Sequence, residues 1–184
     1  GIPLFVSASG QKLPEQDESE RSLCTAGLTA NAGEAQSRGA EVEATYQLSE
    51  GLRINVGGAY VKAELTKTTS LGNDGDRLPS SPETSINVGF NYDFDLAGHA
   101  SYVTGDYAYV GEMYSRVGEA GLESGDYGQL NMSAGININQ FDIELYVNNL
   151  TDDDALTHAD TLMPDARVYR LRPRTIGLNV AYQF

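Results

Sequence analysis

The sequence predicts an all-β fold, an antiparallel up-and-down sheet of the kind that crosses a membrane as a transmembrane β-barrel. Apolar and polar residues alternate along most of the chain, which places every second side chain on one face of a strand. Short and long connections strictly take turns between these segments. Several segments also run to about ten residues or more, as a tilted membrane strand requires, whereas soluble strands average about five or six.

The alternation defines about seven clear strands, each with one apolar and one polar face. In one of the cleanest, Ile86, Val88 and Phe90 alternate with polar residues and glycine. Residues 2–9 are a candidate eighth strand, although Pro3 and a weak pattern count against it. The predicted strands cover 25–47, 52–60, 86–94, 99–114, 130–138, 141–147 and 176–184.

The connections between the predicted strands differ in length in a regular way. Tight turns with favourable turn residues lie at 49–51, 95–98 and 139–140. Long polar connections lie between them, at about 66–82, 115–126 and 151–170. Every second connection of an up-and-down sheet lies at the same end, so one rim carries turns and the other carries loops. This asymmetry is typical of membrane barrels with short periplasmic turns and longer extracellular loops.

Composition and charge restrict the possible partners. A net charge of −14 argues against nucleic acid, because phosphate binding needs clustered Lys and Arg. No run of 18 apolar residues exists, so a membrane-spanning helix is excluded. The single cysteine, Cys24, cannot form an internal disulfide. The chain starts at Gly1 without an apolar signal core, so we expect a removed leader or a fragment of a longer protein.

The last predicted strand ends in an aromatic residue. Its apolar residues are Ile176, Leu178, Val180, Tyr182 and Phe184. This pattern resembles the C-terminal signature of outer-membrane barrels, whose last strand is recognised by the barrel-assembly machinery. The resemblance implies that the apolar face meets outer-membrane lipid, with aromatic side chains at the interface. It also implies localisation in the bacterial outer membrane.

Three further stretches resemble the barrel half of TonB-dependent receptors. The first is the N-A-G-E-A-Q-S-R-G-A-E-V-E stretch at 31–43, the second is Arg77-Leu78-Pro79 followed by Pro82, and the third is the Y-V-N-N-L-T-D stretch at 146–152, with P-R-T at 173–175 opening the last strand. One departure follows Asp152, where the family has an aromatic residue and this chain has D-D-A-L, which affects the shape of that loop. The positions that match the family motifs are Asn31, Gly33, Gly39, Glu41, Asn149, Leu150, Asp152, Pro173 and Arg174.

The resemblance implies a larger protein. Such receptors have a 22-stranded barrel filled by an N-terminal plug, so this chain would be the C-terminal part, with about seven or eight strands. Residues 1–24 would be a partial strand and an extracellular loop, and 25–184 the barrel strands. The implied function is uptake of a scarce nutrient such as an iron–siderophore complex. The implied partners are TonB, through a plug domain absent from this chain, lipopolysaccharide, and a small-molecule ligand of unknown identity.

Several charged and aromatic groups are candidate sites. Acidic clusters at 15–20, 73–76 and 152–154, the last near His158 and Asp160, suit hard cations, but we favour solvated loop charge because none has ligand spacing. No catalytic residue, metal site or cofactor is therefore predicted. Four arginines suit lumen lining, or phosphates of lipopolysaccharide: Arg167, Arg170, Arg172 and Arg174. Four tyrosines suit an interfacial girdle, or stacking on a ligand ring: Tyr102, Tyr107, Tyr109 and Tyr114.

Three alternatives stay open from the sequence. A complete eight-stranded outer-membrane barrel with a structural or adhesion role would use residues 2–9 as its eighth strand. A barrel enzyme would use His158 with Asp160 as the nucleus of a dyad, together with a rim acid or serine. A soluble barrel would show the same alternation with its apolar face turned inward.

Overall fold

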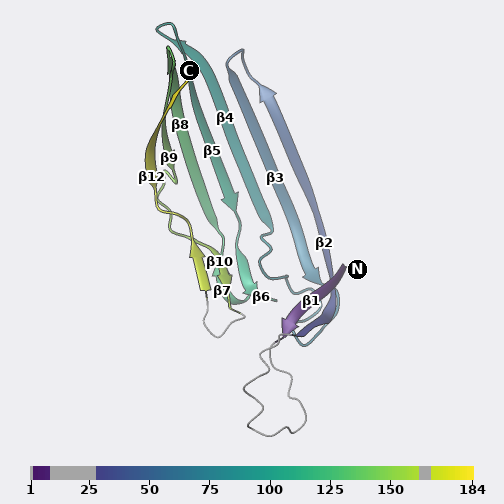
Figure 1. Ribbon diagram of the computed structural model, residues 1–184. Coiled ribbons are helices and arrows are strands. Elements are labelled where there is room, and N and C mark those ends of the chain that lie inside the picture. The colour runs from purple at the N-terminus through teal and green to yellow at the C-terminus, as the bar shows by residue number, and fades with distance from the viewer. Residues whose placement is uncertain (1, 9–27, 162–166) are drawn as a thin grey trace, which may run out of the picture.

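The computed structural model describes residues 2–8, 28–161 and 167–184. Its body is an eight-stranded sheet in the order β1-β2-β3-β4-β5-β8-β9-β12 (Figure 1). Every neighbouring pair is antiparallel, which confirms the predicted up-and-down sheet. The strands of this sheet are β1 (Ile2–Ala8), β2 (Leu28–Gln47), β3 (Leu52–Leu65), β4 (Thr84–Leu96), β5 (His99–Val110), β8 (Tyr127–Ile138), β9 (Phe141–Asn148) and β12 (Thr175–Tyr182).

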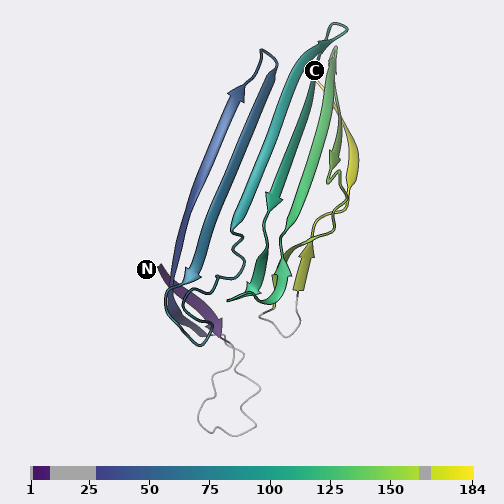
Figure 2. The same ribbon diagram turned by 180° about the vertical axis from the view of Figure 1, so that it is seen from behind.

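The two ends of the sheet differ as the connection lengths predict. The three tight turns lie at one end, beside the C-terminus, and the long connections lie at the other (Figures 1 and 2). The turn after β4 has positive φ at both central residues, Ala97 (55°) and Gly98 (84°), as a two-residue hairpin that follows the twist of its strands requires. Among the described residues no helix is long and apolar enough to cross a bilayer.

Two of the long connections contain short strands that the sequence pattern did not predict. β6 (Met113–Arg116) pairs with β7 (Ala120–Ser124), and β10 (Leu156–Asp160) pairs with β11 (Arg167–Arg170). The predicted strand at 99–114 is therefore wrong at its end, because β5 stops at Val110. β10 lies beside β6 and β7, with buried Met113 and Ala159 contributed by the two ribbons. These ribbons are stabilised by packing against each other. The alternation of apolar and polar residues within a segment does not predict such packing between distant segments.

The sheet is open in the part of the chain that the structure describes. β1 and β12 form its two edges, and no pairing joins them. This differs from the closed eight-stranded barrel considered above, although residues 2–8 do form a strand. β1, which contains Pro3, is an edge strand, the kind of strand in which proline is tolerated. Unpaired edges are costly in lipid, so both edges call for further strands.

The two faces of the sheet differ in polarity, and no second layer of protein covers either one within the described residues. The register places Val56, Val88 and Tyr107 in one row on the apolar face, and each is at least 40% exposed. The few buried apolar side chains lie near the loop end, such as Leu65 at 1% exposure. A soluble domain would bury such a face in a core, whereas a membrane wall exposes it to lipid.

Aromatic side chains gather at both ends of the apolar face. At the turn end, Phe141, Tyr182 and Phe184 form a chain of ring contacts with centroids 5.1 and 5.0 Å apart. Toward the loop end, Tyr60 and Tyr109 lie on this face by register with Ala40 and Ile86. Two aromatic belts on either side of an aliphatic band match the two water–lipid interfaces of a membrane.

Gly39 of β2 lies where a larger residue does not fit. A Cβ added there would lie 2.3 Å from the backbone oxygen of Tyr60 in β3, whereas one added at Gly58 would meet nothing closer than 3.8 Å. Gly39→Ala should therefore destabilise the complete protein by about 1–3 kcal/mol through overpacking. Gly58→Ala is the matched control and should change stability little. Urea unfolding in phospholipid vesicles measures both, and equal effects would contradict the close approach of β2 and β3.

Candidate functional site

The polar face of the sheet carries an acidic set of side chains. The register places all of them on the side opposite Val56 and Val88. No ion pair joins any of these carboxylates to a cation among the described residues. The charged residues of this face are Glu41, Glu43, Asp93, Asp95, Asp106, Asp142 and Glu144, with Arg53 as its cation.

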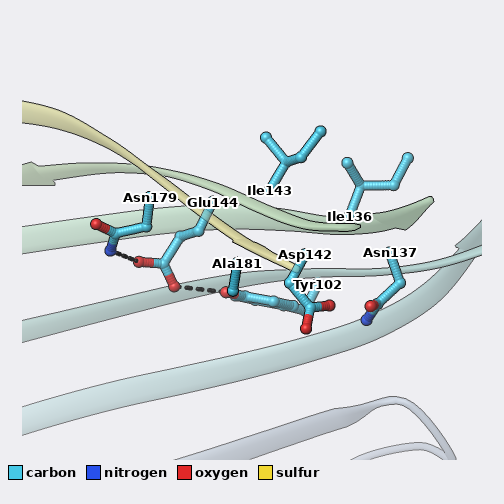
Figure 3. Close-up of a pocket in the computed structure, with 8 residues that line it drawn as sticks. All are labelled: Tyr102, Ile136, Asn137, Asp142, Ile143, Glu144, Asn179 and Ala181. Carbon is cyan, nitrogen blue, oxygen red and sulfur yellow. Dashed lines mark hydrogen bonds between the residues drawn. The ribbon is translucent and has the colours of Figure 1, made fainter. Parts of the chain in front are cut away.

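Glu144 joins three strands on this polar face. Tyr102 of β5 donates a hydrogen bond of 2.5 Å to Glu144 Oε2, and Asn179 Nδ2 of β12 donates one of 3.1 Å to Oε1 (Figure 3). β8 lies between β5 and β9, and the Tyr102 ring crosses it over Gly135. A Cβ on Gly135 would lie within 2.3 Å of that ring, so glycine makes the contact possible.

Figure 3 shows how the two faces diverge around this shallow pocket. Asp142, Asn137 and Glu144 project to one side of the strands, while Ile136 and Ile143 project to the other. The pocket is thus a hollow in the polar face of the sheet, where the neutral donors Tyr102 and Asn179 lie beside the Glu144 carboxylate. Such a surface suits contact with water or with another polar protein surface, and not with lipid.

The segment after β9 forms a turn held by a buried side chain. Asn149 is 1% exposed and has φ of 52°. Its Nδ2 donates to the backbone oxygens of Asp153 and Arg172, both at 2.8 Å, and its Oδ1 accepts from Asp153 N at 3.1 Å. Asp152 Oδ1 accepts from the backbone N of Arg174 at 2.8 Å. The turn therefore fixes the start of β12 against the end of β9.

Arg77 joins the connection after β3 to the β6–β7 ribbon. Its guanidinium donates to Glu112 Oε1 at 3.1 Å and to the Glu112 backbone oxygen at 3.0 Å. Glu83 and Glu119 lie 3.6 and 3.9 Å away, and the Tyr114 ring centroid lies 5.7 Å from the guanidinium carbon. The Arg77 side chain is only 14% exposed, so the pairing is shielded from solvent more than a surface ion pair. Burial raises the pKa of Tyr114, and nearby carboxylates raise it further, so its hydroxyl stays protonated.

A second arginine connects the two ribbons. Arg116 Nη2 donates to the backbone oxygen of Thr161 at 3.1 Å, and the hydroxyls of Ser115 and Thr161 lie 3.0 Å apart. The backbone N of Gly125 also donates to the oxygen of Leu156. The three long connections thus form one continuous rim at the loop end of the sheet.

A family model described as "TonB dependent receptor-like, beta-barrel" matches residues 9–150. The chain belongs to this family. TonB-dependent receptors are proteins of the bacterial outer membrane, so the apolar face is the lipid-facing side of a barrel wall and the polar face lines its interior. This confirms the predicted fold class and localisation, and it excludes the soluble barrel.

The relatives are receptors of much greater length. The pesticin receptor of Yersinia pestis is 28% identical over 84% of this chain, which covers 23% of that protein. The crystal structure of the ferric yersiniabactin uptake receptor FyuA from Yersinia pestis matches with a TM-score of 0.76 at 27% identity, over 85% of this chain and 25% of the other. The ferric preacinetobactin receptor BauA from Acinetobacter baumannii matches in fold, with a TM-score of 0.71 at 23% identity, over 99% of this chain and 26% of the other. The chain spans about a quarter of the length of these receptors.

The positions that match the motifs of TonB-dependent receptors lie in strands of the sheet and in the turn before β12. Gly39 lets β2 approach β3, and a Cβ on Gly33 would meet the Thr69 side chain at 2.8 Å. Glu41 lies on the polar face. Leu150 N donates to the backbone oxygen of Leu130, and Pro173 lies two residues before the start of β12. Asn31 lies within β2, and Asn149, Asp152 and Arg174 form the turn described above. In the C-terminal signature, Ile176, Leu178, Val180 and Tyr182 are exposed on the apolar side. Phe184 follows the end of β12, where it is exposed and its ring contacts Tyr182.

The acidic clusters are not gathered into a cation site. Asp76 Oδ2 accepts from the backbone N of Asn73, and Asp154 lies 3.6 Å from Arg170. The cluster at 15–20 lies outside the described residues. Among the described residues no group of three or more His, Cys, Asp and Glu side chains is arranged to hold a metal. The His158 ring lies beside Tyr169, with centroids 5.9 Å apart.

The arginines and tyrosines singled out in the sequence do not gather at one site in the structure. Arg170 contacts Asp154, and Arg174 contacts Asp152, while the lining of the lumen by the four arginines stays a prediction. Arg170 and Arg174 lie beyond the end of the sheet, where they stabilise loop structure. Tyr107 and Tyr109 are on the lipid-facing side, Tyr102 is on the polar face, and Tyr114 lies in the rim beside Arg77. The four tyrosines therefore do not form one stacking platform.

Proposed function

We propose that this chain forms part of the wall and outer rim of a TonB-dependent receptor that takes up an iron–siderophore complex. The observation that carries the proposal is the eight-stranded sheet with an apolar lipid face and an acidic inner face, in a chain 27% identical to a receptor for ferric yersiniabactin uptake. We infer that residues 25–184 supply barrel strands and that residues 1–24 belong to a strand and an extracellular loop.

The open edges support a role within a larger barrel. β1 and β12 each have a free backbone edge among the described residues, and lipid offers no hydrogen-bond partner. Further strands of the same protein would pair with these edges. A plug inside the barrel would face the acidic wall and carry the contact with TonB, and β12 would be the strand that the assembly machinery recognises.

The rim supports ligand contact at the outer mouth. Arg77 and Arg116 hold three connections together, so their outward surface is a fixed shape and not a set of independent loops. A preorganised surface binds a rigid chelate with a smaller entropic cost than loops that must first become ordered. The relatives named above are receptors, one of them for ferric yersiniabactin uptake, and none of them is described as an enzyme. The barrel-enzyme alternative therefore has less support than the receptor.

Uptake of radioactive iron by a deletion strain carrying the complete gene tests the proposal. Uptake of at least one ferric siderophore should require the gene and an energised inner membrane. Arg77→Ala should lower the apparent affinity for that complex about tenfold, since it removes hydrogen bonds to a charged group. Lys67→Ala, which removes an exposed ion pair with Glu34, is the matched control. Uptake that is independent of the gene for a panel of ferric hydroxamates, catecholates and thiazoline chelates would refute the proposal.

A further inference from the structure

The apolar face of β2 and β3 ends in two cations that lie directly opposite each other. The register pairs Arg38 of β2 with Lys62 of β3. The next pair on this face, toward the turn end, is Ala40 with Tyr60, and after it comes Val42. Val42 and Tyr60 are 64% and 53% exposed, so they belong to the lipid-facing band. The two cations therefore mark the loop-side boundary of that band.

The cation pair is only half compensated by the protein. Lys62 Nζ lies 2.6 Å from Glu64 Oε2, and Gln36 Nε2 donates to Glu64 Oε1 at 3.1 Å. The Arg38 guanidinium interacts electrostatically with the same Glu64 carboxylate, but it forms no ion pair or hydrogen bond with any residue that the structure describes, and Arg38 is exposed. Like charges directly opposite in a sheet repel each other. An anion between the two side chains would remove this repulsion.

The position of the pair fits the headgroup layer of the outer leaflet. Tyr60, one residue pair closer to the turn end, lies where interfacial aromatic side chains gather. Two residues along a strand cover about 7 Å, so Arg38 and Lys62 lie just outside the hydrocarbon. Long cationic side chains reach headgroups from such positions, and guanidinium matches phosphate through two parallel hydrogen bonds.

We propose that Arg38 and Lys62 bind a phosphate of an outer-leaflet lipid headgroup on the outside of the barrel. Arg38 supplies the bidentate contact, and Glu64 fixes the Lys62 ammonium beside it. The lipid's acyl chains lie along the apolar band that begins at Ala40 and Val42. Arg170 and Arg174 are poorer candidates for a lipid phosphate, because both lie beyond the strands of the sheet and outside its apolar band.

Lipid binding to the complete protein tests this site. The purified, delipidated protein in neutral detergent is titrated with diphosphorylated lipid A, and bound lipid is counted by native mass spectrometry. Arg38→Gln should weaken the tightest binding event about tenfold, since a hydrogen bond to a charged group is lost. Arg53→Gln makes the same charge change on the opposite, polar face and should leave lipid binding unchanged.

The outcomes separate clearly. Unchanged binding in Arg38→Gln, or an equal loss in Arg53→Gln, would overturn the proposal. Displacement of the lipid by millimolar inorganic phosphate would overturn the assignment to a lipid headgroup and leave a free-anion site. Should Arg38→Gln fail to fold, as judged by heat-modifiable migration, Lys62→Gln tests the other half of the pair with the same expected loss. Folding and iron uptake should persist in both variants, because the site is remote from the lumen.

Discussion

Asn149→Ala is expected to destabilise the complete protein by about 2–4 kcal/mol, because it leaves several buried backbone groups without hydrogen-bond partners. Asn149 is almost fully buried, and its amide pairs with the backbone of Asp153 and Arg172. Alanine would remove these bonds while water cannot replace them. Urea unfolding in phospholipid vesicles, followed by heat-modifiable migration, measures the loss.

Two variants separate the causes of that loss. Asn148→Ala alters the neighbouring residue, which is exposed and makes no side-chain hydrogen bond in the described structure, so it should cost less than about 0.5 kcal/mol. Asn149→Gly accepts the left-handed backbone at φ of 52° but still lacks the amide. It should therefore be nearly as unstable as Asn149→Ala. A glycine variant as stable as the natural protein would show that backbone conformation, and not hydrogen bonding, is what Asn149 supplies.

Val88→Arg is expected to cost about 2–4 kcal/mol of folding free energy in a bilayer, because it places a charge on the lipid-facing side near the middle of β4. Val88 is 40% exposed and lies between Val56 and Tyr107 in the cross-strand row. Folding into vesicles of defined thickness, with urea titration, gives the free energy. The cost should fall in a thinner bilayer, where the arginine reaches the headgroups more easily.

Asn87→Arg is the matched control for the lipid-facing assignment. Asn87 is adjacent to Val88 in β4 and lies on the polar face, where it is exposed. The same substitution there should cost less than about 1 kcal/mol, since the lumen side is hydrated. Equal costs, or a larger cost at Asn87, would mean that the apolar face does not meet lipid.

Local periodicity was sufficient to predict most strands of this protein. In β4 the alternation of Ile86, Val88 and Phe90 with polar residues fixes two faces, because successive side chains of a strand point in opposite directions. Turn chemistry was equally local, as at Ala97-Gly98. Where strands were short, as in β6 and β10, periodicity had too few residues to register, and the prediction of plain loops failed.

The functional contacts depended on register between distant segments. Tyr102 reaches Glu144 only because Gly135 lies between them in the intervening strand. Arg77 meets Glu112 across 35 residues of sequence, and a motif match at Arg77 gave no indication of that partner. The pairing of Arg38 with Lys62 likewise appears only when β2 and β3 are aligned residue by residue.

The sequence by itself determined that this chain is a set of amphipathic membrane strands with turns at one rim and loops at the other. It did so because strand periodicity and turn preference are properties of neighbouring residues. Only the tertiary structure decided that the sheet of the described residues is open, that the loops form one rim, and that Asn149 closes the turn before β12. Those features arise from hydrogen bonds between residues far apart in sequence, whose partners are chosen by the alignment of whole strands.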